Sequence, residues 1–182
     1  MVLYAAVGVT EKRQAYDLLA QGVKKYWNVS PFPKLERQED GKPRFADLEG
    51  YQFNLSHSGP WALCALDERA VGVDIQEVRS WKPRLPDRVC SGEEKSWLAR
   101  QEDFDLAFAL IWALKESREK FEGRGIIGTG DMIRAIRVPL PERIGECREL
   151  DGLWFRTYAG DGWAAAVCGL SVPPEELVWL NC

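Results

Sequence analysis

The first apolar positions along the chain predict a buried strand followed by a helix. Residues 2–9 form a short apolar run that leads directly into charged sequence, as expected of a strand in a core. Thr10 and Glu11 supply capping residues for a helix, because apolar residues then recur every three or four positions until Asn28. These apolar residues are Ala15, Leu18, Leu19, Val23 and Trp27.

A surface loop and three short strands are expected next. Residues 31–44 are rich in proline and charge, which predicts a loop that leads to a turn at residues 41–43. Apolar residues then gather in residues 51–56, 61–66 and 71–76, and turn-like residues separate the three runs. This pattern predicts an antiparallel meander of three strands.

A segment with two prolines marks the middle of the chain. Pro83 and Pro86 prevent a long helix from crossing residues 79–88, because proline lacks a backbone donor and clashes with the preceding turn. We therefore expect a boundary here, with an N-terminal half over residues 1–82 and a C-terminal half over residues 83–182.

The second half is predicted to begin with helices and to end with strands. Ser91 and Glu94 have the spacing of a capping box, so a short helix is expected from this point. Residues 106–121 form the best amphipathic helix pattern in the chain, and Gly123 would end that helix. Strands are expected over residues 131–138, 153–158, 163–170 and 176–180, joined by Asp-Gly and Gly-Asp-Gly turns.

Charge and cysteine content narrow the classes of function. A formal net charge of -4 over 182 residues gives no general attraction to nucleic acid. The five cysteines are widely spaced and the chain has one histidine, so we expect reduced thiols rather than a zinc site. The apolar run at residues 2–9 is too short to span a membrane and has no basic leader, which predicts a cytoplasmic protein.

Residues 71–76 divide into an apolar face and a polar face. In a strand, successive side chains point to opposite sides. The odd-numbered residues of this run are apolar and would pack in a core. The even-numbered residues are Gly72, Asp74 and Gln76, and their side would face a cleft.

A polar stripe runs along the helix predicted at residues 106–121. Trp112, Glu116 and Lys120 recur every four residues, so they share one face of that helix. If this face meets the polar side of the strand, Glu116 would join Asp74 and Gln76 as oxygen ligands suited to magnesium. Lys120 would then neutralise phosphate charge.

Each of these residues also has an ordinary structural explanation. Asp74 alone fits a carboxylate at a strand end, and Glu116 with Lys120 fits a helix-surface pair worth roughly a few tenths of a kcal/mol. His57, the only histidine, fits a residue that bonds to backbone in a turn. The functional hypothesis therefore depends on the occurrence of these residues together.

Four short motifs occur in order between residues 41 and 125. They are Gly41-Lys42-Pro43, then Phe53-Asn54-Leu55-Ser56-His57-Ser58-Gly59, then Gly72-Val73-Asp74-Ile75, then Trp112-Ala113-Leu114-Lys115-Glu116-Ser117 with Lys120. Any one of them is a weak signal, but the set in this order is specific. Together they resemble the larger, Sfp-type class of 4'-phosphopantetheinyl transferases.

The resemblance implies a fold, an activity and a set of partners. The fold would be an α+β pseudo-dimer of two similar α+β halves, with coenzyme A and a divalent cation in the cleft between them. The activity would be transfer of the 4'-phosphopantetheine group from coenzyme A to a serine of an apo carrier protein, which leaves adenosine 3',5'-bisphosphate. Since one chain contains the whole cleft, we expect a monomer that acts on an apo acyl or peptidyl carrier protein, with no nucleic acid and no membrane as partner.

The resemblance also implies roles for individual residues. Asp74 and Glu116 would bind Mg2+, and Gln76 would be a neutral ligand or a neighbour of the ligands. Mg2+ and Lys120 would hold the charge that develops on the leaving adenosine bisphosphate. Either Glu116 or a metal-bound water that it orients would accept the proton of the attacking serine. The residues that would contact the 3'-phosphate or adenosine part of coenzyme A are Lys42, Ser56 and His57.

Gln76 departs from the family's pattern, which has an acidic residue two positions after the metal-binding aspartate. A neutral amide weakens cation binding, but phosphate oxygens and waters can complete the metal's shell. The departure supports a second hypothesis, a non-catalytic protein that binds coenzyme A or a carrier and has a degenerate metal site. Retention of Asp74, Glu116 and Lys120 argues for catalysis instead. A different magnesium-dependent nucleotide enzyme ranks last, because the chain lacks the glycine-rich phosphate-binding motifs of such enzymes.

A cluster of basic residues follows the predicted Asp74 strand. Its members are Arg79, Lys82, Arg84 and Arg88, with the acidic Asp87 among them and Trp81 as an apolar neighbour. From charge alone the cluster fits a solvated linker. In the resembling family the carrier protein docks near this region, and carrier proteins are commonly acidic, which implies electrostatic steering with Trp81 as an anchor.

Overall fold

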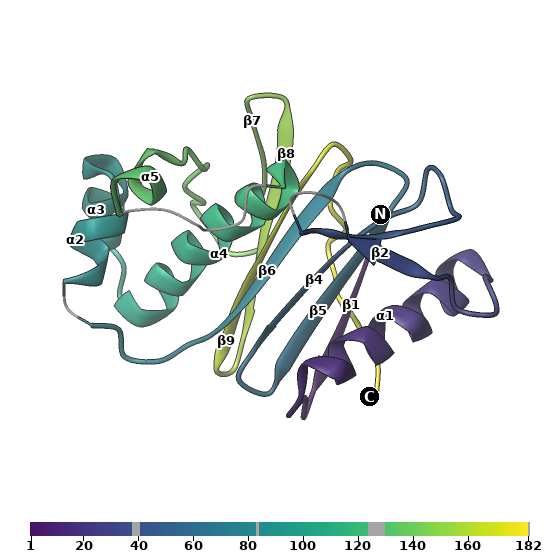
Figure 1. Ribbon diagram of the computed structural model, residues 1–182. Helices are drawn as coiled ribbons and strands as arrows, with labels where there is room; N and C mark the ends of the chain where they lie inside the picture. The colour runs from purple at the N-terminus through teal and green to yellow at the C-terminus, as the bar shows by residue number, and fades with distance from the viewer. Residues whose placement is uncertain (38–40, 83, 124–129, 182) are drawn as a thin grey trace.

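Helices and strands combine in this chain into two four-stranded sheets, each with a helix against it (Figure 1). The structure is a computed structural model that describes residues 1–37, 41–82, 84–123 and 130–181. The helices are α1 (Lys12–Trp27), α2 (Leu85–Val89), α3 (Gly92–Leu98), α4 (Phe104–Glu122) and α5 (Gly130–Ala135). The strands are β1 (Val2–Val7), β2 (Leu35–Arg37), β3 (Pro43–Phe45), β4 (Gln52–Ser58), β5 (Trp61–Asp67), β6 (Val71–Glu77), β7 (Cys147–Leu150), β8 (Leu153–Gly160), β9 (Trp163–Gly169) and β10 (Val178–Trp179).

The two large sheets do not follow the order of the chain. The first has the order β10-β1-β5-β4 and the second has the order β6-β9-β8-β7. The prediction of a three-stranded meander is therefore correct for β4 and β5 but wrong for β6, which pairs with β9 instead. The physical reason is the apolar side of β6, because Val73 and Ile75 pack face to face against Leu63 and Ala65 of β5. Pairing with β9 places this apolar side of β6 between the two sheets.

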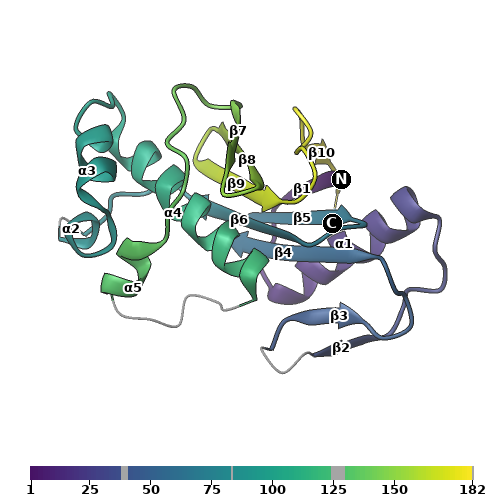
Figure 2. The ribbon, with the colours of Figure 1, turned by 90° about the horizontal axis from the view of Figure 1, so that it is seen from above.

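The elements form layers, and three regions of apolar packing lie against the two large sheets. One region lies between α1 and the first sheet, and a second lies between the two sheets. A third lies between α4 and the outer face of the second sheet. Figure 2 shows α1 and α4 on different sides of the strands. The β2–β3 hairpin lies on the side of α1. This arrangement confirms the predicted α+β class and is compatible with two similar halves, each built from a sheet and a helix.

The predicted helix ends are confirmed by their caps. Helix α1 begins with a capping box between Glu11 and Gln14 and ends at Asn28, which has a left-handed conformation. Ser91 and Glu94 form the expected capping box at α3. Helix α4 ends at Gly123, whose φ of 74° suits glycine.

Three local predictions differ from the structure. Residues 130–135 form α5 rather than part of a strand, because Ile133 and Ile136 lie three residues apart and both pack on the α2–α4 core. The loop expected over residues 31–44 includes β2 and most of β3, and these two strands pair with each other. Strand β7, over Cys147–Leu150, had no counterpart in the prediction.

The boundary expected at residue 82 stays a prediction. Strand β6 precedes it but belongs to the second sheet, and β10 follows it but belongs to the first sheet. Each sheet therefore contains one strand from the other side of that boundary.

A close approach of α4 to β6 depends on Gly72. A Cβ atom at this position would lie 2.0 Å from the Ser117 carbonyl oxygen and 2.4 Å from the Phe121 nitrogen. No residue with a side chain fits there unless α4 moves away. Gly72 thus sets the distance between the strand that carries Asp74 and the helix that carries Glu116.

A buried ion pair connects three helices in the second half. Lys115 of α4 is 0% exposed, and its Nζ lies 2.8 Å from Glu94 Oε1. The same ammonium donates to the carbonyl oxygens of Ile133 and Ile136, each at 3.0 Å. Helices α3 and α5 are therefore both tied to α4 through one side chain.

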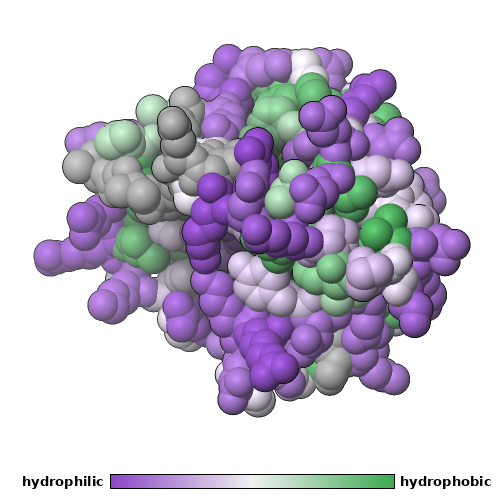
Figure 3. Space-filling view, turned by 45° about the vertical axis from the view of Figure 1, so that its right-hand side comes forward, coloured by the Kyte–Doolittle hydropathy of each residue, from purple (hydrophilic) through white to green (hydrophobic). Residues whose placement is uncertain are grey.

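One face of the molecule and the described cysteines have the following character. The face in Figure 3 is mostly hydrophilic, and its hydrophobic residues form separate small patches. Among the described residues no helix has the length and apolarity that crossing a membrane requires. Four cysteines are free in this part of the chain, and burial raises the pKa of Cys90 and of Cys168 to about 12, so both are protonated at neutral pH.

Candidate active site

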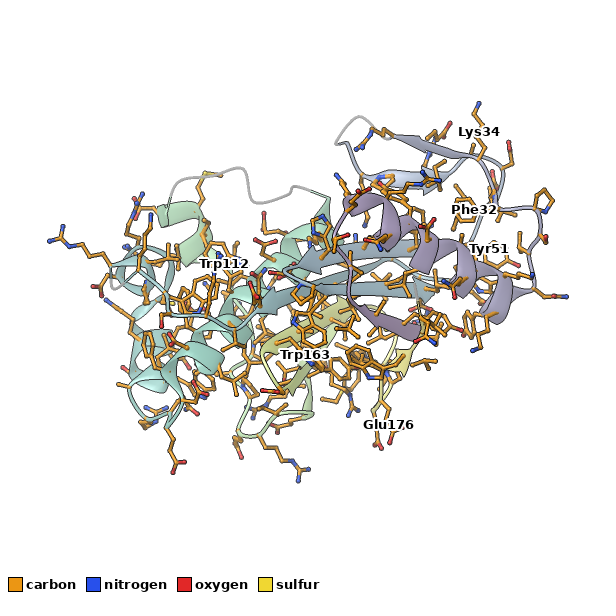
Figure 4. The ribbon with its side chains drawn as sticks, turned by 90° about the horizontal axis from the view of Figure 1, so that it is seen from below. Phe32, Lys34, Tyr51, Trp112, Trp163 and Glu176 are labelled. Atoms are coloured by element: carbon orange, nitrogen blue, oxygen red, sulfur yellow. The ribbon has the colours of Figure 1, made fainter. Side chains whose placement is uncertain are left out.

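A cavity of about 410 Å3 lies where α1, the β2–β3 hairpin, β4, β6 and α4 meet. Its size is within the range of small-molecule sites in proteins. The residues that line it are Lys12, Ala15, Tyr16, Arg37, Pro43, Asn54, Leu55, Ser56, His57, Ser58, Asp74, Gln76, Glu116 and Lys120. Figure 4 shows Trp112 on the α4 side of this region and Tyr51 and Phe32 away from it, near α1 and the hairpin.

Asp74 accepts more side-chain hydrogen bonds than Glu116, the other described carboxylate that lines the cavity. It is 1% exposed, and its Oδ1 accepts from Lys120 Nζ and from Ser56 Oγ, both at 2.7 Å. Its Oδ2 accepts from Gln76 Nε2 at 2.6 Å. Three donors thus hold the buried charge in one position, as a buried carboxylate requires.

Glu116 faces the same cavity one helical turn before Lys120. Its Oε1 accepts from Trp112 Nε1 at 2.8 Å, and its Oε2 lies 3.9 Å from Lys120 Nζ. The pKa of Glu116 is raised to about 7, first by burial and then by the charge of Asp74, while Lys120 and Trp112 oppose the rise. Glu116 is therefore poised between its protonated and ionised forms near neutral pH.

Local structure explains why these residues meet. Strand alternation turns Asp74 and Gln76 to the side of β6 opposite its apolar residues, as predicted. Helical spacing places Glu116 and Lys120 on one face of α4, and that face meets the polar side of β6. The sequence predicted a joint site only if the polar face of the helix meets the polar side of the strand. In the structure these two faces do meet.

The donor set of the cavity fits a magnesium ion that shares its shell with a bound phosphate. Asp74 and Glu116 supply two carboxylates, and the Lys120 ammonium lies 2.7 Å from the first and 3.9 Å from the second. Gln76 would add a neutral oxygen after a half-turn of its amide. No group of three or more histidine, cysteine, aspartate or glutamate residues exists in the described ranges, so waters and phosphate oxygens would complete six-fold coordination.

The three residues expected to contact coenzyme A have different surroundings. His57 is exposed and lines the cavity. Ser56 also lines it, but its hydroxyl bonds to Asp74 and Lys120. Lys42 is not among the described lining residues, and its Nζ donates to the Lys120 carbonyl oxygen at 3.0 Å, at the end of α4. Contact of all three with coenzyme A stays a prediction.

Sequence reasoning assigned no site role to Arg37, Asn54 and Ser58, which also line the cavity. Lys12 comes from the start of α1 and Arg37 from the β2–β3 hairpin, and both bring positive charge to it. Nothing in the sequence indicates that these two segments meet. Asn54 and Ser58 come from β4, where polar residues at every second position were the available signal.

The basic cluster lies on the surface beside α4. Its members Arg79, Lys82, Arg84 and Arg88 are exposed, and so is Asp87. The Arg79 guanidinium lies 5.3 Å from the ring centre of Trp81, and Trp81 Nε1 donates to the Asp105 carbonyl oxygen at 3.2 Å. Trp81 also stacks on Trp112 at 6.5 Å between ring centres, which connects this surface to the residue that bonds Glu116.

Comparisons with known proteins identify the family of this chain. Residues 70–168 match the 4'-phosphopantetheinyl transferase superfamily, and this range includes Asp74, Glu116 and Lys120. The chain is similar to 4'-phosphopantetheinyl transferase Sfp of Bacillus subtilis (strain 168), with 32% identity over 159 residues, which cover 81% of this chain and 68% of the relative. It is also similar to 4'-phosphopantetheinyl transferase AcpT of Salmonella typhi, with 34% identity over 132 residues, which cover 69% of this chain and 66% of the relative.

Proposed function

The chain belongs to the 4'-phosphopantetheinyl transferase superfamily, and we propose that the carboxylates of Asp74 and Glu116, with Lys120, form its reaction centre. The enzyme transfers the 4'-phosphopantetheine group from coenzyme A to a serine of an apo carrier protein. The observation that carries the proposal is the meeting of these three side chains in one cavity, with Lys120 Nζ 2.7 Å from Asp74 and 3.9 Å from Glu116.

In the proposed reaction one phosphorus–oxygen bond forms and another breaks. The hydroxyl oxygen of the carrier serine attacks the phosphorus that bears pantetheine, and the bond from this phosphorus to the adenosine bisphosphate oxygen breaks. The serine proton passes to Glu116, directly or through a water that Glu116 orients. Adenosine 3',5'-bisphosphate leaves with the extra negative charge, and Lys120 stabilises it.

We propose that Asp74 and Glu116 hold Mg2+, with Gln76 as a neutral ligand or a neighbour of the ligands. When bound, the ion would neutralise pyrophosphate charge and make the leaving oxygen a weaker base. The supporting observation is the meeting of the two carboxylates in one cavity, where burial first and the charge of Asp74 second raise the pKa of Glu116. Trp112 would hold Glu116 in the orientation that both roles need.

Coenzyme A would occupy the cavity with its phosphates near the basic residues of the rim. Lys12 and Arg37 supply positive charge there, and the exposed His57 supplies a hydrogen-bonding ring. Lys42 supports the same region through its bond to the end of α4. The acidic surface of a carrier protein would be steered by the basic cluster next to Trp81. That the enzyme works as a cytoplasmic monomer stays a prediction.

The function is tested by the intact mass of an apo acyl carrier protein after incubation with this protein, coenzyme A and magnesium. We expect a gain equal to one phosphopantetheine group. A carrier in which alanine replaces the acceptor serine should show no gain, and neither should a reaction with excess chelator. Failure with several apo carriers, while coenzyme A still binds, would favour the non-catalytic binding protein.

A separate prediction concerns Gln76. The substitution Gln76→Glu adds a third carboxylate next to Asp74, so we expect tighter Mg2+ binding by about 3- to 10-fold, because ligand charge controls cation affinity. Titration calorimetry with Mg2+ in the presence of coenzyme A measures the change. Gln52→Glu is the matched control, since Gln52 is exposed at the start of β4 and does not line the described cavity. Equal Mg2+ affinity of Gln76→Glu and the control would exclude position 76 from the metal site.

A further inference from the structure

Strands β4 and β6 are edge strands of different sheets, and three side chains of β4 connect them. Asn54 Oδ1 accepts from the Val73 amide at 3.0 Å, Ser56 Oγ from the Ile75 amide at 3.2 Å, and Ser58 Oγ from the Glu77 amide at 3.0 Å. Each accepting residue precedes its donor by 19 positions, so the two strands run in the same direction. We call these three bonds the polar ladder.

Sheet geometry explains why the polar ladder has this regular form. Strand β6 pairs with β9 on one side, and an antiparallel pair uses the backbone groups of alternate residues. The amides of Val73, Ile75 and Glu77 point to the other side, where an open edge would leave them without partners. Alternate side chains of β4 reach these amides where a neighbouring strand would otherwise supply carbonyl oxygens.

The ladder also affects the shape of the site. A side chain reaches farther than a backbone carbonyl, so the two strands are held apart without direct pairing of their backbones. The cavity opens at this place, since the three ladder residues of β4 line it together with Asp74 and Gln76 of β6. The spacing between the two sheets therefore depends on the length and polarity of side chains at positions 54, 56 and 58.

Ser56 has a second task that the other two ladder residues lack. Its hydroxyl accepts from the Ile75 amide and from Lys120 Nζ at 2.9 Å, and it donates to Asp74 Oδ1 at 2.7 Å. A serine hydroxyl has one donor and two acceptor positions, so these three bonds use its whole capacity. Ser56 is 7% exposed, and its hydroxyl lies between Asp74 and Lys120 of the reaction centre.

We infer that Ser56 is a positioning residue, which fixes Asp74 and Lys120 relative to each other and to the polar ladder. In this role its hydroxyl does not hold a phosphate group of coenzyme A. The inference deepens the proposed function and rests on it, because Asp74 and Lys120 are taken as parts of the reaction centre.

The test compares Ser56→Ala with Ser56→Thr, using coenzyme A and 3'-dephospho-coenzyme A as substrates. Ser56→Ala should lower kcat by about 10- to 100-fold, because small displacements of reacting groups have effects of this size. Its dissociation constants for the two compounds, measured by calorimetry, should change by the same factor. Ser56→Thr keeps a hydroxyl and should retain most of the activity.

Ser58→Ala serves as the ladder control. It removes a partner from the Glu77 amide as Ser56→Ala does from the Ile75 amide, so both variants should lower the melting temperature. The loss of kcat should be much larger for Ser56→Ala, since only Ser56 contacts Asp74 and Lys120 among the three ladder residues.

Two results would overturn the inference. One is a loss of affinity in Ser56→Ala for coenzyme A but not for 3'-dephospho-coenzyme A, which would identify Ser56 as a ligand of the 3'-phosphate. The other is an unchanged melting temperature in both alanine variants, which would show that the polar ladder does not stabilise the protein. A wild-type protein without transferase activity would instead refute the proposed function, while melting temperatures and dissociation constants would still test the ladder.

Discussion

Replacing Glu116 with glutamine is expected to lower kcat for phosphopantetheine transfer by about 100- to 1,000-fold. Glutamine has nearly the same shape and can still accept from Trp112 Nε1, but it cannot take a proton or balance the charge of Mg2+. Steady-state kinetics with an apo acyl carrier protein gives kcat and the KM for coenzyme A. We expect the KM to change less than kcat, because the lost interactions belong mainly to the transition state.

The stability of the Glu116→Gln variant separates chemistry from folding. Burial first and the charge of Asp74 second raise the pKa of this carboxylate, so its removal relieves both the desolvation cost and the repulsion. The melting temperature should therefore stay the same or rise while activity falls. Glu93→Gln is the matched control with full activity, since Glu93 is an exposed residue of α3 outside the cavity lining. A Glu116→Gln enzyme with more than a tenth of wild-type kcat would exclude Glu116 as the base.

The second large effect is expected on stability and concerns the buried Lys115. Lys115→Met removes the ammonium but keeps a similar chain length, which leaves Glu94 buried without its cation. Breaking a buried pair in this way costs about 3–5 kcal/mol of unfolding free energy. The carbonyl oxygens of Ile133 and Ile136 lose the same donor, so α5 should detach from α4 most readily. Urea unfolding measures the total loss.

Two further variants identify the cause of that loss. The double variant Lys115→Met with Glu94→Gln should recover part of the stability, because no unpaired charge then stays buried. Lys95→Met is the matched control, since Lys95 pairs with Asp87 at an exposed site and should cost less than about 1 kcal/mol. A loss in Lys115→Met no larger than that of the control would contradict the prediction.

Periodicity in the sequence was sufficient to predict most elements that bury an apolar face. Helices α1 and α4 and strands β4, β5, β8 and β9 lie where the patterns predicted them. The errors fall on short segments, where few residues carry a pattern. Helix α5 over Gly130–Ala135 is the example, because only Ile133 of this helix is buried.

The sequence by itself determined which residues share a face in the candidate site. Alternation places Asp74 and Gln76 together, and helical spacing places Trp112, Glu116 and Lys120 together, because both periods are properties of the backbone. The fixed order of four motifs then indicated the family, which the match of residues 70–168 confirmed.

Only the tertiary structure decided how the two faces meet and what else joins them. Strand β6 pairs with β9 of the second sheet, and Gly72 allows α4 to pack closely against β6. Lys120 therefore bonds to Asp74, although the two residues are 46 positions apart in the chain. The bonds of Ser56 and the placement of Arg37 at the cavity depend on the same packing. Local sequence patterns do not contain these contacts, because strand pairing and helix docking depend on side chains that are distant in the chain.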